Sequence, residues 1–141
     1  MNEDFLDAHM RHWTDAESLY AAQRWANADH LYGISAECGL KGLTETFKNG
    51  PLAGKERRHI MEANKPETAW DVFETYRSGH AQGTKFLLPS INPFNDWDVG
   101  QRYANQNHFN QAHVDAHRLG AEQVRALVKL MQRETGCDDH F

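Results

Sequence analysis

Arg102 and His108 are the residues of this chain whose types and spacing best suit chemistry on a phosphate. A guanidinium can hold two phosphate oxygens, and an imidazole can take a proton from a ribose 2′-hydroxyl or give one to a leaving oxygen. Together they are sufficient in principle for RNA cleavage without a metal. On an ideal α-helix they would point about 120° apart, so they converge only if the intervening "YANQN" is partly unwound. The alternative is an ion-pairing surface Arg beside a capping or solvated His.

His113 and His117 form a second candidate, because a spacing of four residues places two imidazoles on one face of a helix, as in many metal sites. A pair of ligands does not make a site. No helical carboxylate stands at the spacing of an HExxH motif, and further ligands would have to come from other helices. We therefore expect no metal and no other cofactor, with both His as core or surface residues.

Two further groups of charged residues are candidates for support or binding. The densest basic run of the chain could contact phosphates through its charge, although a charged loop is more often only solvated. Glu37 and Lys41 have the spacing of a helix-stabilising ion pair, and Glu37 could instead orient a base or an arginine across the fold. The basic run consists of Lys55, Arg57, Arg58 and His59.

Apolar residues recur at intervals of three and four along four segments, which predicts four helices. The first covers roughly residues 3–24, although Thr14 to Glu17 would also fit a capping box that starts a helix. The second, residues 26–47, has two apolar stripes and three Gly, which predicts a central helix with close neighbours. A third begins after Pro66 and stops at 78–79, and the last ends before Gly136.

No segment alternates at a period of two, so the sequence predicts an all-α, antiparallel four-helix bundle with a long loop before the last helix. Residues 80–109 form that loop. Connections of this length are usually functional or mobile in a small domain. At 141 residues the chain is expected to form a single domain over 1–141.

Composition limits the partners and the compartment. A formal net charge of −5 argues against a general electrostatic attraction to polyanions, so any nucleic-acid contact needs a local patch. Protonation of all nine His would bring the net charge from −5 to +4, which makes the surface charge sensitive to pH. Cys38 and Cys137 form no disulfide framework, and no apolar run resembles a signal or a membrane span. We expect a soluble cytoplasmic protein with reduced thiols.

Two stretches of the sequence resemble the HEPN family, small all-α domains named for nucleotide binding in higher eukaryotes and prokaryotes. "ADHLYGISAECGLKGL" is similar to the second HEPN helix, where a small-small-Glu-x-x-Leu-Lys pattern recurs. "FNDWDVGQRYANQNH" resembles the segment before the last helix, where ribonuclease members carry Arg, four to six residues, and then His. Five residues separate Arg102 and His108 here. The resemblance covers roughly residues 5–135.

The resemblance implies a metal-independent endoribonuclease of the toxin or defence type, in which a homodimer brings two such segments together. His108 would be the acid and base, and Arg102 would stabilise charge on the phosphate. Tyr103 departs from the polar residue frequent at that position in the ribonucleases. It favours the alternative, a non-catalytic module that binds nucleotides or partners with a nucleotidyltransferase. For a toxin, the resemblance implies an antitoxin as a partner. Trp97 and Tyr103 could stack on bases, or Phe94 and Trp97 could plug the end of the bundle.

Overall fold

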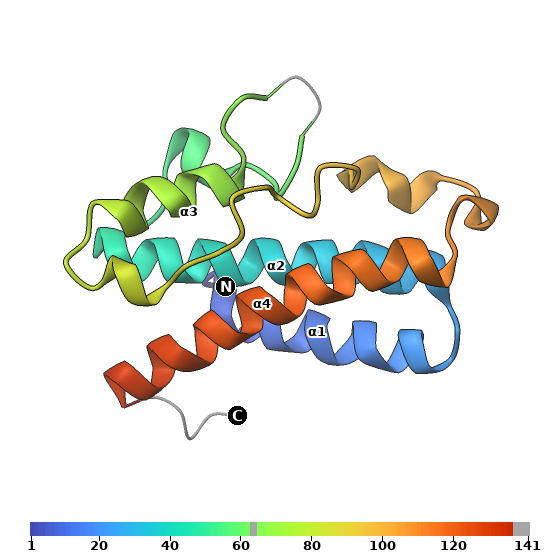
Figure 1. The fold of residues 1–141 in the computed structure, drawn as a ribbon, viewed down its shortest axis with the longest axis horizontal. Helices are drawn as coiled ribbons and strands as arrows, with labels where there is room; N and C mark the ends of the chain where they lie inside the picture. Colours follow the sequence, from blue (N-terminus) through green and yellow to red (C-terminus); the bar gives the residue numbers. More distant parts are fainter. Residues whose placement is uncertain (63–64, 137–141) are drawn as a thin grey trace.

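The computed structural model describes residues 1–62 and 65–136, and within them the chain is helical and contains no strand. The prediction of an all-α bundle is confirmed. The α-helices are α1 (Phe5–Ala21), α2 (Trp25–Lys48), α3 (Ala69–Ser78) and α4 (Gln111–Thr135) (Figure 1). Short 3-10 helices interrupt the connections: η1 (Gly54–Arg57), η2 (Gly83–Lys85), η3 (Val99–Tyr103) and η4 (Gln106–His108). None of the described helices is long and apolar enough to cross a membrane.

The helix ends follow from capping residues. Asp4 caps α1 by accepting a hydrogen bond from the backbone N–H of Asp7 at 3.0 Å, and Thr14 lies inside this helix. The longer of the two predicted starts is therefore the observed one. Asn110 caps α4 in the same way through the N–H of His113, and Gly136 ends α4 in the left-handed conformation with φ 77°.

The second helix is central, as its two apolar stripes predict, because α1, α3 and α4 all pack on it. Its Gly residues permit close approach. A Cβ added to Gly39 would lie 2.6 Å from the Val124 side chain on α4 and 2.9 Å from His9 on α1. At Gly33 the neighbour is the Trp97 ring, which an added Cβ would meet at 2.1 Å. Gly33 therefore makes room for the long connection rather than for another helix.

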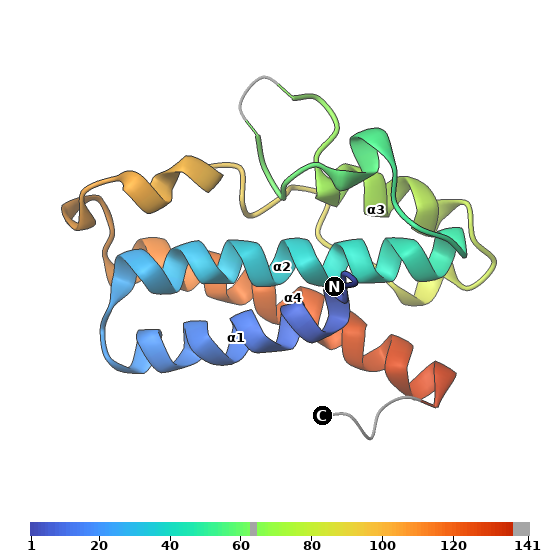
Figure 2. The ribbon, with the colours of Figure 1, turned by 180° about the vertical axis from the view of Figure 1, so that it is seen from behind.

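The direction of the last helix explains the length of the connection before it. α1 and α2 form an antiparallel pair, but α4 runs in the same general direction as α2 (Figures 1 and 2). The antiparallel arrangement predicted for the bundle therefore holds for α1 and α2 but not for α2 and α4. α3 ends near the C-terminal end of α2, whereas α4 begins near the N-terminal end of α2 (Figure 1). The chain must therefore return along a helix of 24 residues, about 36 Å, before α4 can begin. Residues 79–110 make this return, and Phe94 and Trp97 anchor them in the core at 0% and 1% exposure.

Of the two cysteines, only Cys38 belongs to the residues that the structure describes. Cys38 on α2 is a free thiol, and burial raises its pKa to about 12, so it is expected to be unreactive at neutral pH. Cys137, for which a reduced thiol is also predicted, lies outside the described residues.

Candidate functional site

An open polar groove lies where the returning segment passes the turn between α1 and α2. Its cavity of about 440 Å³ has the size of a small-ligand site. Two arginines, Arg24 and Arg102, line it, and none of the described lining residues carries a carboxylate. In a chain of net charge −5, this is a local positive patch. The lining residues are Gln23, Arg24, Trp25, Ala26, Asn27, Gln101, Arg102, Ala104, Gln106, Asn107 and Phe109.

Arg102 is oriented by two contacts within its own segment. Its Nη1 donates a hydrogen bond to the backbone carbonyl of Val99 at 2.7 Å. Its guanidinium carbon lies 4.6 Å from the centroid of the Tyr103 ring, which is a cation–π geometry. Tyr103 is 80% exposed, so its ring is accessible to solvent. Both contacts leave part of the guanidinium fork for an anion, because Arg carries five N–H donors.

His108 lies beside this groove but is not part of its wall. It is exposed in η4, whereas Arg102 is in η3, and Ala104 and Asn105 between the two are extended. The partial unwinding that convergence requires is therefore present. Even so, one protomer does not place both side chains in one cavity, so a shared reaction centre would need a second copy or a bound ligand.

Trp97 is a correction to the predicted binding set. The ring is 1% exposed, stacks on His30 at 5.8 Å between centroids, and donates from Nε1 to the carbonyl of Asp29 at 3.2 Å. A buried indole cannot stack on a base. The alternative prediction, that Phe94 and Trp97 plug the bundle, agrees with the packing.

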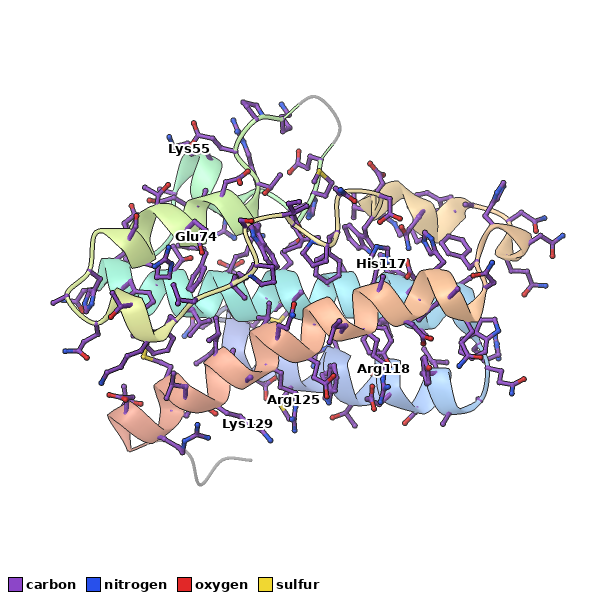
Figure 3. All side chains as sticks on the ribbon, viewed as in Figure 1. Lys55, Glu74, His117, Arg118, Arg125 and Lys129 are labelled. Atoms are coloured by element: carbon purple, nitrogen blue, oxygen red, sulfur yellow. The ribbon has the colours of Figure 1, made fainter. Side chains whose placement is uncertain are left out.

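The basic run is a second correction, because it lies away from the groove. It belongs to η1 and the residues that follow η1, beside α3 and towards the C-terminal end of α2 (Figures 1 and 3). The groove lies at the N-terminal end of α2. Its members are also paired. Lys55 contacts Glu67 at 2.7 Å, Arg57 pairs with Glu3, and Arg58 donates to the Glu67 carbonyl at 3.3 Å. These three residues cannot contact the same phosphate as Arg102.

Glu37 and Lys41 form the expected pair, at 3.0 Å, but their role is to hold a loop. The second oxygen of Glu37 accepts hydrogen bonds from His59 Nδ1 and from the backbone N–H of Ile60, both at 2.9 Å. Burial alone would raise the pKa of Glu37, but the hydrogen bond from His59 and the charge of Lys41 lower it overall. Glu37 therefore orients His59, not an arginine or a catalytic base of the groove.

Sequence reasoning missed a cluster of two carboxylates and two imidazoles. His117 on α4 contacts Asp29 through Nδ1 and Asp96 through Nε2, both at 2.6 Å. His113 lies one turn earlier, with Nε2 at 3.7 Å from Asp29 and Nδ1 at 3.8 Å from Asp96. The premise that His113 and His117 lack a third ligand is therefore wrong. The carboxylate of Asp29 lies next to both rings and could be that ligand.

A signal for Asp29 was present in the sequence. Asp29 precedes Tyr32 by three residues and Ala36 by seven, so it lies on an apolar stripe of α2. An acid in that position needs a buried cation or donors. Asp96 carried no comparable signal. Apolar residues around it do not recur at a regular spacing, so the sequence does not indicate whether its side chain is buried.

Comparisons of the chain with family models, with curated proteins and with solved structures give no match. The resemblance to HEPN domains therefore depends on the two quoted motifs, and a function is inferred from the residues of the groove.

Proposed function

We propose that this protein binds RNA, or a nucleotide, through the groove between the α1–α2 turn and residues 99–109. The observation that carries the proposal is that two arginines, Arg24 and Arg102, line the groove, whereas no described lining residue is acidic. Each guanidinium can hold two oxygens of a phosphate, and the surrounding amides can hydrogen-bond bases or ribose. Tyr103 adds an exposed ring for stacking.

We further propose that a homodimer cleaves RNA at this surface without a metal, as the resemblance to HEPN ribonucleases implies. The 2′-oxygen attacks the adjacent phosphorus, the bond to the 5′-oxygen breaks, and a 2′,3′-cyclic phosphate remains. His108 moves the proton between the 2′-hydroxyl and the leaving 5′-oxygen, and Arg102 stabilises the charge on the phosphate. The exposure of His108 next to the groove fits a reaction centre that two copies complete.

Binding without cleavage is the second candidate. It is favoured by the absence of His108 from the wall of the groove and by the contact between Arg102 and Tyr103. In this case the groove would still recognise a phosphate, but no side chain would transfer the proton.

Binding is tested by fluorescence anisotropy of a labelled single-stranded RNA at several salt concentrations. Arg102→Ala and Arg24→Ala should each weaken binding about 10–100-fold, since each removes a charge-assisted contact. Each should also make the salt dependence shallower. Lys55→Ala is the matched control, because it removes one cation at the far end of α2 and should change the affinity little. Equal losses in all three variants, or none in any of them, would contradict the groove as the binding site.

A further inference from the structure

We propose that Asp29, His113 and His117 bind one divalent transition-metal ion, with Asp96 and Gln101 hydrogen-bonded around them. One ligand atom from each of the three residues lies within 4.8 Å of the others, which is close enough to surround a single ion after small adjustments. Asp29 comes from α2, whereas both imidazoles project from consecutive turns of α4. The site would therefore join two packed helices.

Each imidazole has one nitrogen for the ion and one for an outer carboxylate. His117 Nδ1 and His113 Nε2 face Asp29, while His117 Nε2 and His113 Nδ1 face Asp96. Metal-binding His usually donates from its second nitrogen to a carboxylate, which fixes the ring and strengthens the ligand. Asp96 occupies that outer position for both rings. Gln101 Nε2 donates to Asp29 Oδ2 at 2.6 Å and orients the third ligand.

A cation also suits the charges of the cluster. Asp29 and His117 are fully buried, and the Asp29 carboxylate faces ring nitrogens of both His113 and His117. A divalent ion between these groups would offset the charge of the buried carboxylate, and any proton on a coordinating ring nitrogen would pass to solvent on binding.

Two nitrogens and one carboxylate oxygen are donors that suit Zn²⁺ and its transition-metal neighbours, and a three-ligand set leaves a position for water. Mg²⁺ is disfavoured because it prefers oxygen ligands in an octahedron. The neighbour of Gln101 in the chain is Arg102, and both line the groove. An ion at Asp29 would therefore stiffen the wall of the groove from behind without contacting an RNA phosphate.

Untagged protein, stripped with a chelator and dialysed, should be titrated with Zn²⁺ by calorimetry, and the metal content should be measured after gel filtration. We expect one Zn²⁺ per chain, a higher melting temperature with Zn²⁺, and no comparable effect of Mg²⁺. His113→Ala should abolish stoichiometric binding. Asp96→Asn should weaken it about 10–100-fold, because this residue acts through the rings. His80→Ala, which removes an exposed imidazole elsewhere, should leave the affinity unchanged.

His113 is the preferred ligand to replace, because it is only partly buried and its loss leaves the bond between His117 and Asp29 intact. Thermal melts without metal show that each variant is folded. Absence of Zn²⁺ binding in the folded wild type, or binding that survives both His113→Ala and Asp96→Asn, would overturn the site. In either case the cluster is held together by the contacts of His117 with Asp29 and Asp96 alone.

Discussion

Among single residues, Glu37 makes more contacts than its motif predicts. Its position in the small-small-Glu-x-x-Leu-Lys pattern and its pairing with Lys41 could be predicted from the helical spacing. Its contacts with His59 and Ile60 could not, because they join α2 to a loop with no periodicity. The same holds for Asp29: its burial could be read from the stripe, but its partners Asp96 and Gln101 could not.

The pair of Glu37 and His59 gives a pH-dependent prediction. The pKa of Glu37 is lowered from 4.5, so its contribution to stability is present above that value and is lost as pH falls through its folded pKa. The pKa of His59 is raised from 6.5 by the hydrogen bond that its ring donates to Glu37, so its contribution is present below 6.5 and is lost as pH rises through the folded pKa. Both contributions are present between about pH 4.5 and 6.5.

Glu37→Gln should therefore lower the free energy of unfolding by about 2–3 kcal/mol near pH 5.5, and by less near pH 8.5. Urea unfolding at both values measures the difference. His59→Gln is the control. In that background, Glu37→Gln should lower the free energy of unfolding by the same amount at pH 5.5 and at pH 8.5. An effect of Glu37→Gln that is independent of pH in the otherwise wild-type chain would show that His59 is not its partner.

At the scale of elements, the helices were predictable and the path between them was not. A period near 3.6 is a local property, and the end of α3 at Ser78 and the cap of α4 at Gly136 come from residues next to those ends. The parallel course of α2 and α4 is instead decided by where residues 79–110 pack. That packing depends on Trp97 fitting against Gly33, a contact between segments far apart in the chain.

Gly33→Ala tests this contact. Its Cβ would overlap the Trp97 ring, so the substitution should cost about 1–3 kcal/mol of stability. In a Trp97→Ala background the same substitution should instead stabilise the protein by about 0.5–1 kcal/mol, because Ala favours a helix over Gly. Denaturant unfolding of the four proteins forms a double-mutant cycle.

Gly50→Ala is the control for the general effect of replacing Gly, since an added Cβ there meets nothing within 4 Å. It should change stability by less than about 0.5 kcal/mol. If Gly33→Ala changes the stability as little as Gly50→Ala does when Trp97 is present, then Trp97 does not pack closely against Gly33.

At the scale of the whole molecule, the groove, the buried cluster and the exposed His108 lie along one continuous segment. Asp96 reaches the cluster, Gln101 connects it to the groove, Arg102 faces the groove, and His108 lies just beyond. One copy does not bring Arg102 and His108 into one cavity, and in the proposed reaction a second copy completes the centre. The proposed activity should therefore depend on dimer formation.

The proposed ribonuclease activity can be measured by cleavage of a labelled single-stranded RNA in EDTA, with identification of the product ends. We expect cleavage that leaves 2′,3′-cyclic phosphates, with a rate per chain that falls on dilution below the dimer dissociation constant. His108→Ala should lower the rate about 10²–10⁴-fold while the protein stays folded, and Arg102→Ala should also remove most of the activity. A parallel thermal melt in EDTA separates loss of chemistry from loss of structure. A folded wild-type dimer that cuts no RNA, or cleavage that survives both substitutions, would contradict the proposed ribonuclease activity.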